Sequence, residues 1–179
     1  MKTYRLFLIA ALLAGMSTLP VIDASAQEKH RINYQVPAEK TKYVQQHVID
    51  AGDVKGHQVR ILEIKKDILK DSLVLEDVNV VEEWDRGYSD YIDGNGRNWG
   101  YITFILENGD KVFARWEGNA QTVIGSDGAK KSSGTSTVVL SGGTGKFQKI
   151  RGTIRGSYTF DPGKGINTGH SEGEYWMGE

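Results

Sequence analysis

The stretch that decides the fold is a pair of segments, 99–106 (WGYITFIL) and 111–116 (KVFARW), separated by a short linker that contains Asn108-Gly109. Both segments are rich in β-branched and aromatic residues, which favour strands. Asn-Gly between two such runs is typical of a two-residue type I′ turn, because both central residues of that turn need a positive φ. The sequence therefore predicts an antiparallel hairpin.

A two-residue turn also fixes which residues of the hairpin lie opposite each other. It pairs Leu106 with Lys111, Phe104 with Phe113, Ile102 with Arg115 and Tyr101 with Trp116. Because side chains alternate across a strand, one face receives Trp99, Tyr101, Thr103, Ile105, Val112, Ala114 and Trp116. The other face receives Ile102, Phe104, Leu106 and Phe113, with Lys111, Arg115 and Glu117 towards its ends. Both faces are apolar, so we expect a central hairpin whose second face is covered by another element or by a partner.

Further strand-like runs lie on both sides of this hairpin. No long stretch has apolar residues at helical spacing, and turn residues such as Gly52 and Asp127-Gly128 separate the runs. The fold class that this pattern predicts is all-β, a single antiparallel β-barrel of about eight strands. The additional runs are 43–49, 57–64, 78–91, 135–140, 153–160 and 170–177.

The first 26 residues have the pattern of a secretory signal peptide. Lys2 and Arg5 precede an apolar run over residues 6–16, and Ala24-Ser25-Ala26 is a small-x-small cleavage pattern. The run is too short to span a bilayer. We expect cleavage after Ala26, export to the periplasm or the medium, and no stable membrane insertion afterwards. Residues 27–40 are expected to form a flexible arm or an edge strand, and residues 41–179 the β-barrel domain.

Composition excludes several functions for the 153 residues that follow the predicted cleavage site. They carry 20 Lys and Arg against 22 Asp and Glu, which gives no electrostatic reason to bind nucleic acid. The chain has no cysteine, so disulfides, thiolate nucleophiles and cysteine-based zinc sites are absent. We expect no cofactor and no metal.

One segment is more specific than the rest: residues 136–153 (STVVLSGGTGKFQKIRGT). A strand runs into a Gly-Gly-Thr-Gly turn, one helical turn directs Phe147 and Ile150 inward, and a new strand follows. This segment resembles the corresponding stretch of the allene oxide cyclase and dirigent proteins. The resemblance implies an eight-stranded antiparallel barrel with a hydrophobic central cavity. It identifies no catalytic residue, because none of that family's catalytic positions can be matched here.

Four candidate sites are better explained as ordinary structure. Gly145-Lys146 lacks the other residues of a phosphate loop, and residues 93–96 lack the closing Glu of a calcium loop. His47 and His57 lie opposite each other if the first hairpin turns at Gly52, but Zn²⁺ needs a third ligand. Paired carboxylates, Glu82 with Glu83 and Glu172 with Glu174, are typical of solvated strand faces.

An aromatic set offers the best candidate for a binding site. Large rings spread over several strands fill a core or line a cavity, and plain core packing is the simpler explanation. Two charged residues flank one of the tryptophans. The candidate ligand-binding residues are Trp84, Trp99, Tyr101, Arg115, Trp116, Glu117, Tyr158 and Trp176.

Three functions remain open at this point. The first is a barrel that binds a small hydrophobic or aromatic molecule in its cavity without turnover. The second is a cofactor-free cyclase or isomerase of the allene oxide cyclase type, in which Arg115 or Glu117 steers a reactive intermediate. The third is a structural or assembly role in the cell envelope, with the chain forming homo-oligomers or binding an envelope partner.

Overall fold

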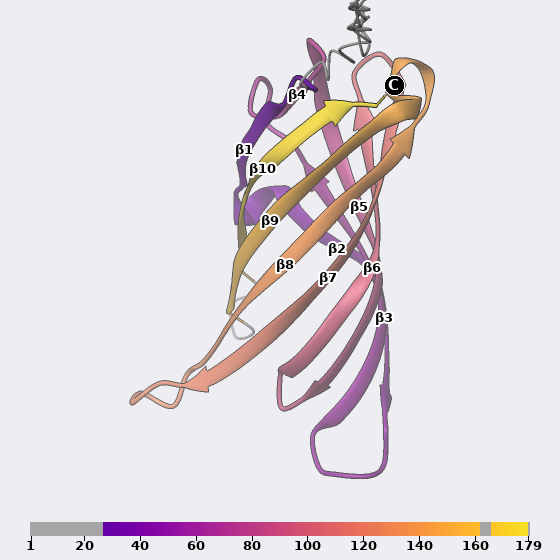
Figure 1. Cartoon of the computed structure of the whole chain (residues 1–179). Helices are drawn as coiled ribbons and strands as arrows, with labels where there is room; N and C mark the ends of the chain where they lie inside the picture. The colour runs from indigo at the N-terminus through magenta and orange to yellow at the C-terminus, as the bar shows by residue number, and fades with distance from the viewer. Residues whose placement is uncertain (1–26, 162–165, 179) are drawn as a thin grey trace, which may run out of the picture.

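The computed structural model describes residues 27–161 and 166–178, so the predicted signal peptide lies outside the described residues. The described chain is all antiparallel β-structure, as the sequence predicted, with ten strands in place of the expected eight and two short 3₁₀ helices (Figure 1). None of its helices is long and apolar enough to cross a membrane. The elements are β1 (His30–Val36), η1 (Ala38–Lys40), β2 (Thr41–Asp50), β3 (His57–Asp67), β4 (Val74–Leu75), β5 (Val78–Ile92), β6 (Asn95–Leu106), β7 (Lys111–Ile124), β8 (Lys130–Gly143), η2 (Gly145–Lys149), β9 (Ile150–Asp161) and β10 (Ile166–Met177).

All strands belong to one antiparallel sheet with the order β1-β10-β9-β8-β7-β6-β5-β3-β2, and the two-residue strand β4 pairs only with β5. Most neighbours are consecutive in the chain, which is the pattern of hairpin-connected strands. Residues 30–36, for which we expected a flexible arm or an edge strand, form the edge strand β1. Three of its side chains, Ile32, Tyr34 and Val36, are buried in the core.

The sheet curls so that its two edges approach each other without pairing. Pro37 and η1 carry the chain from β1 at one edge to β2 at the other. Across the interior the Tyr34 hydroxyl donates to Glu83 on β5 at 2.8 Å, and the rings of Tyr43 on β2 and Phe160 on β9 lie 6.4 Å apart. No ladder joins β1 to β2 within residues 27–161 and 166–178. The expected barrel is therefore present as a curled sheet that is not closed.

The hairpin between β6 and β7 differs from the expected one by a single residue. The Leu106 amide donates to the Asp110 carbonyl at 2.9 Å, which leaves a three-residue loop of Glu107, Asn108 and Gly109. Gly109 is the one residue of this loop with a positive φ, 86°. This is a type I turn followed by a G1 bulge, whose geometry also suits the twist of the flanking strands. The predicted type I′ turn is wrong.

The extra loop residue exchanges the two faces of β7. Phe104 pairs with Val112 and Ile102 with Ala114, in place of the predicted Phe113 and Arg115. A slip of one residue moves a whole strand's side chains to the other face of a sheet. Trp116 consequently points inward, opposite Gly100. The outer face instead receives Trp99, Tyr101, Phe113, Arg115 and Glu117, all of which are exposed.

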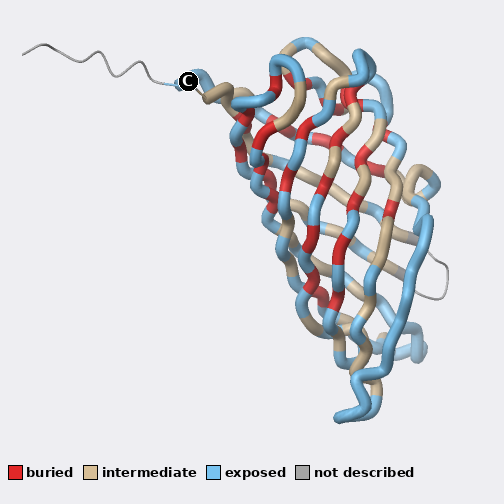
Figure 2. The backbone as a smooth tube through the Cα atoms, turned by 90° about the vertical axis from the view of Figure 1, so that its right-hand side faces the viewer, coloured by how far each residue is buried: buried red, intermediate tan, exposed pale blue. Residues whose placement is uncertain are grey.

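The hydrophobic core lies inside the curl, towards the end of the molecule where η2 packs (Figure 2). Phe147 and Ile150 are fully buried there, as the sequence predicted for residues 136–153. The buried apolar side chains around them include Leu75, Val80, Phe104, Leu106, Val112 and Leu140. At the opposite end the β2–β3 and β7–β8 hairpins project with mostly exposed residues.

The inner face is narrow because glycines occupy many of its positions. Gly87, Gly100 and Trp116 lie side by side on neighbouring strands, and a Cβ at either glycine would overlap the Trp116 ring. A Cβ at Gly134 would overlap the Tyr158 ring in the same way. The missing side chains thus provide the space in which the two inward aromatic rings lie.

We expect Gly100→Ala to lower the free energy of unfolding by about 2 kcal/mol, because the added methyl group meets both the Trp116 ring and the Arg86 carbonyl. Urea denaturation followed by circular dichroism measures this. Gly169→Ala is the matched control, since a Cβ there meets only the Ser157 carbonyl, at 3.9 Å. Equal stability of the two variants would contradict the role assigned to this close packing.

Candidate functional site

A cavity of about 160 Å³ lies inside the curl, between the strands of the two sheet edges. Its wall includes Tyr34 and Val36 from β1, Thr41 and Tyr43 from β2, and residues of β10. The unpaired seam between β1 and β2 therefore belongs to the wall. The polar, charged and aromatic side chains of the wall include Tyr34, Lys66, Glu83, Asp85, Asn98, Trp116 and Tyr158.

One wall of the cavity carries a buried cluster of charges. Glu83 and Asp85 are alternate residues of β5, so both point inward, and Lys66 lies opposite Glu83 on β3. The Lys66 ammonium contacts Glu83 Oε1 at 2.6 Å and Asp85 Oδ2 at 2.7 Å. Tyr34 donates to the other oxygen of Glu83. Glu83 thus has a partner on each oxygen. On Asp85 the Lys66 ammonium contacts Oδ2, and a hydrogen bond with the Glu83 carboxyl contributes to the raised pKa of Asp85.

Asp85 is the unusual member of this cluster. Its neighbours across the inner face are Ile64 and Ile102, and its Oδ1 is buried without a hydrogen-bond partner in the described part of the chain. Burial raises the pKa of Asp85 to about 7, and the Glu83 carboxylate adds to this against the opposing effect of Lys66. A buried carboxyl oxygen without a donor is costly, so the cluster leaves one acceptor of Asp85 unsatisfied.

The other two charged groups remain ionised. Burial disfavours the charge on Lys66, but the Asp85 and Glu83 carboxylates outweigh it and raise the pKa of Lys66. Burial also acts on Glu83, where the nearby Lys66 charge prevails and lowers the pKa of the Glu83 carboxyl. At pH 7 the cluster therefore holds a fixed Lys66–Glu83 ion pair beside an Asp85 carboxyl that is close to half-protonated.

A second polar group on the cavity wall holds the aromatic rings in place. Asn98 accepts from the Trp116 indole N–H at 2.9 Å and donates to the hydroxyls of Tyr91 and Tyr158 at 2.9 and 3.1 Å. Burial raises the pKa of both tyrosines, so they stay neutral. The polar ends of these rings are thus satisfied by Asn98. The intervening wall is apolar and includes Ile64, Ile102 and Val138.

Comparison with known proteins finds only a distant likeness, in the arrangement of the strands. No family model matches the chain, and no curated protein matches it. Two solved structures of pterocarpan synthase dirigent proteins are similar in fold. PsPTS1 has 14% identity and a TM-score of 0.46 over 85% of this chain and 97% of that one, and GePTS1 has 13% and 0.45 over 86% and 88%. The structural neighbours are dirigent proteins. Such distant likeness concerns the strand arrangement alone.

The structure divides the aromatic set predicted from the sequence. Trp116 and Tyr158 line the interior cavity. Trp99, Tyr101, Arg115 and Glu117 line a hollow on the outer face of the sheet. The remaining two residues also lie outside the cavity: Trp84, beside Glu82 and the Arg86 guanidinium, and Trp176, beside the Lys29 ammonium.

The charged cluster was missed by sequence reasoning. The sequence pattern places Glu83 in a solvated Glu82–Glu83 pair and singles out neither Lys66 nor Asp85. One feature of the sequence could have revealed the cluster: Glu83, Asp85, Gly87 and Ser89 alternate along β5 and therefore share one face of the strand. Two of these four residues, Gly87 and Ser89, are small. Small residues beside acids on one face indicate a narrow interior.

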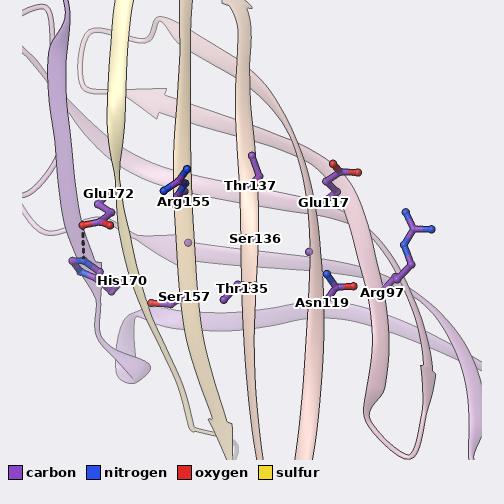
Figure 3. A pocket seen from close by; sticks show the side chains of 12 residues that line it. Arg97, Glu117, Asn119, Thr135, Ser136, Thr137, Arg155, Ser157, His170 and Glu172 are labelled. Atoms are coloured by element: carbon purple, nitrogen blue, oxygen red, sulfur yellow. Dashed lines mark ion pairs between the residues drawn. The ribbon is translucent and has the colours of Figure 1, made fainter.

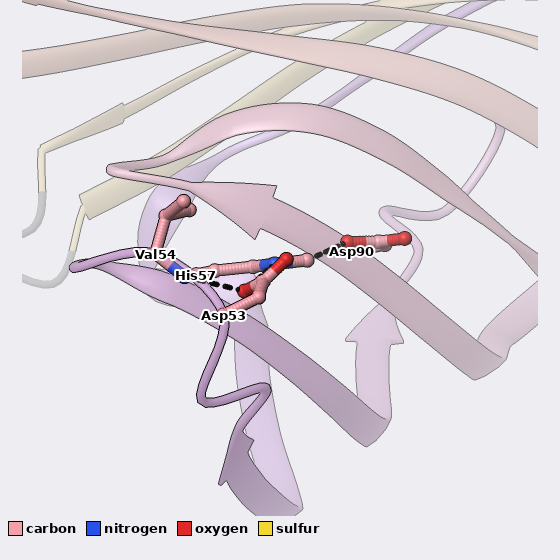
Figure 4. A network of polar contacts seen from close by, with 4 residues as sticks. All are labelled: Asp53, Val54, His57 and Asp90. Carbon is pink, nitrogen blue, oxygen red and sulfur yellow. Dashed lines mark hydrogen bonds and ion pairs between the residues drawn. The ribbon is translucent and has the colours of Figure 1, made fainter.

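The other conspicuous polar network lies at the tip of the β2–β3 hairpin (Figure 4). His57 contacts Asp53 through Nδ1 at 2.6 Å and Asp90 through Nε2 at 2.7 Å. The hydrogen bonds from Asp90 and Asp53 raise the pKa of His57. His47 pairs with Ile61, so the two histidines do not face each other. No group of three or more metal-ligating side chains occurs among the described residues.

We expect Asp85 to make stability fall as pH rises between about 4 and 7. The folded chain keeps the Asp85 proton up to about pH 7, whereas the unfolded chain releases it near the ordinary aspartate pKa of 3.8, so rising pH favours unfolding in this window. Asp85→Asn removes this slope. Urea denaturation at several pH values measures it, with the exposed Asp77→Asn as control. Parallel pH curves for wild type and Asp85→Asn would disprove the assignment.

We expect protonated His57 to hold the loop at residues 51–56 against β5. The pKa of His57 is higher in the folded chain than the 6.5 of the unfolded chain. The stabilisation is therefore complete below pH 6.5 and is lost as the pH rises through the pKa of His57 in the folded chain. NMR titration of the His57 ring should give a pKa above 6.5. In Asp90→Asn the pKa should move back towards 6.5, and a titration curve that does not move would refute the bridging role.

Proposed function

We propose that this protein binds a small, largely apolar molecule inside the curled sheet, and that a hydrogen-bond donor on this molecule meets Asp85. The observation that carries the proposal is the buried, unpartnered Asp85 Oδ1 in the wall of an interior cavity. Binding sites are typically apolar cavities with a few convergent polar groups, and this cavity has that composition.

The cavity volume limits the size of the ligand. A volume of about 160 Å³ is close to that of engineered apolar cavities, about 150 Å³, that accept benzene. A single ring with one polar substituent fits this space, and a lipid chain does not. Pockets for drug-sized molecules are larger, about 300 Å³ or more.

The chemistry of the wall specifies the polar substituent. A hydroxyl or amine hydrogen on the ligand would satisfy Asp85 Oδ1, while the ring would lie against Ile102, Val138 and Trp116. A ligand with only acceptor atoms would satisfy Asp85 only when that carboxyl is protonated. Above pH 7 the site therefore favours donors over acceptors, because the carboxylate form of Asp85 accepts only.

The same carboxyl supports a second candidate function, acid–base catalysis. A carboxyl with a pKa of about 7 can both give and take a proton at neutral pH. Arg115 and Glu117, the pair considered from sequence, are exposed on the outer face, so they do not line this cavity. An enzyme built on this cavity would use Asp85. Mass spectrometry of the probe recovered from the binding assay below would reveal a changed product.

Tryptophan fluorescence tests the binding proposal, because Trp116 is the one tryptophan of four that lines the cavity. In a chain carrying Trp84→Phe, Trp99→Phe and Trp176→Phe, phenol and aniline should change Trp116 emission saturably. Benzene should bind more weakly at pH 8, since it leaves Asp85 without a donor. Asp85→Leu should abolish this preference, because it removes the carboxylate that distinguishes the probes.

A cavity-filling variant provides the control. Gly169 lines the cavity and has open space beyond its Cα, so Gly169→Leu should occupy the cavity without disturbing the backbone. Loss of the saturable signal in Gly169→Leu, with the fold intact by circular dichroism, locates binding in the interior. Unchanged binding in that variant, or no saturable response to any of the three probes, would refute the proposal.

A further inference from the structure

The outer face of the sheet carries two adjoining hollows that the interior site does not use. One has a volume of about 520 Å³ and spans β6 to β10, and the other, of about 560 Å³, spans β5 to β8. Figure 3 shows the side chains that line the first hollow. Arg97, Glu117 and Thr137 line both hollows, which therefore form one elongated groove. This groove is several times larger than the interior cavity and is open along its length.

An aromatic platform forms one end of the groove. Tyr88 and Trp99 are direct cross-strand partners, and their rings stack with centroids 5.8 Å apart and planes inclined by 25°. Each residue is 41% exposed, and Tyr101 beside them is 63% exposed. Exposed apolar surface rimmed by polar groups is typical of an interaction site, and no other element in the described part of the chain covers these rings.

Polar side chains continue from this platform in strand register. Trp99 lies opposite Glu117, Glu117 opposite Thr137, and Thr137 opposite Arg155. Arg97 and Asn119 form the neighbouring pair. Because adjacent strands are about 4.8 Å apart, these groups form a row with a regular spacing that extends away from the rings.

The charged groups of this row have no hydrogen-bond or ion-pair partner among the described residues. Within the described residues, 27–161 and 166–178, the guanidinium groups of Arg97, Arg115 and Arg155 make no hydrogen bond or ion pair. The Glu117 carboxylate makes none there either. Opposite charges at such short separations usually pair with each other on protein surfaces. Here donors and acceptors remain free beside an aromatic platform.

We propose that this groove binds an extended, uncharged saccharide chain, with one sugar ring against the exposed part of the Trp99 ring. The C–H bonds of a pyranose ring carry partial positive charge and face the negatively charged face of an aromatic ring. The hydroxyls that follow are both donors and acceptors, and they match a row that mixes guanidinium, carboxylate, amide and hydroxyl groups. This inference is independent of the interior cavity.

The composition of the groove argues against other occupants. A nucleic acid or another polyanion requires a surface of one sign, whereas Glu117 and Glu172 lie between and beside the arginines. A lipid or another purely apolar ligand would leave the arginines and Glu117 facing hydrocarbon, at a cost in desolvation. A polyol satisfies both signs of charge and the rings together.

Isothermal titration calorimetry and ¹H–¹⁵N chemical-shift mapping test the proposal with cellohexaose, maltohexaose and chitohexaose as probes. At least one hexasaccharide should bind, with shifts confined to the groove residues of β5–β10 on the outer face. Trp99→Ala should weaken that binding about tenfold, the loss expected for one aromatic stacking contact. Glu117→Gln, which keeps the shape and removes the charge, should weaken it less. Trp176→Ala is the matched control, since Trp176 lies on β10 outside the groove and should leave binding unchanged.

Three outcomes would overturn the inference. The first is that none of the three hexasaccharides binds. The second is that Trp99→Ala and Trp176→Ala bind equally well. The third is that light scattering detects an oligomer which Trp99→Ala dissociates, since a second copy of the chain would then cover the groove. Binding in the Gly169→Leu variant should be normal, so failure of the interior site and failure of this groove are distinguishable.

Discussion

The structure depends on a close approach between one indole ring and two glycine backbones. Trp116 on β7 lies over Gly100 on β6 and Gly87 on β5, which are beside it on the inner face of the sheet. Any side chain at those positions would push the strands apart. Because these positions lack side chains, the sheet can curl tightly enough to bring the residues of β1 and β2 around a common interior, even though no ladder joins the two edges.

The narrow interior of the curled sheet also holds charged groups. Lys66, Glu83 and Asp85 occupy inward positions between the apolar core around Phe147 and the small residues near Ser89. Buried ion pairs rarely add stability, because removing charges from water costs about as much as their attraction returns. Their persistence, together with the free Asp85 oxygen, is easier to understand as a requirement of ligand binding than as a requirement of folding.

The two candidate sites of the molecule use opposite faces of the same strands and differ in physical character. The interior site is small and contains one perturbed carboxyl group. The outer groove is large, open and rich in polar groups that have no partner among the described residues. Strands β6 to β8 contribute alternate residues to each: Trp116 points inward, while Glu117 and Arg115 point outward.

The sequence by itself determined the all-β class, the approximate strand positions, and the buried plug formed by Phe147 and Ile150, because each depends on local composition and on residues near in the chain. It failed at the β6–β7 turn, where Asn108-Gly109 is compatible with a two-residue and a three-residue loop, and the choice exchanged Phe113 for Val112 in the core. It also could not place Tyr34 beside Glu83, or Lys66 between Glu83 and Asp85. Those contacts join strands far apart in the sequence, and only the direction in which the sheet curls decides which face becomes the interior. Tertiary structure alone therefore separated the aromatic residues that line the cavity from those that face solvent.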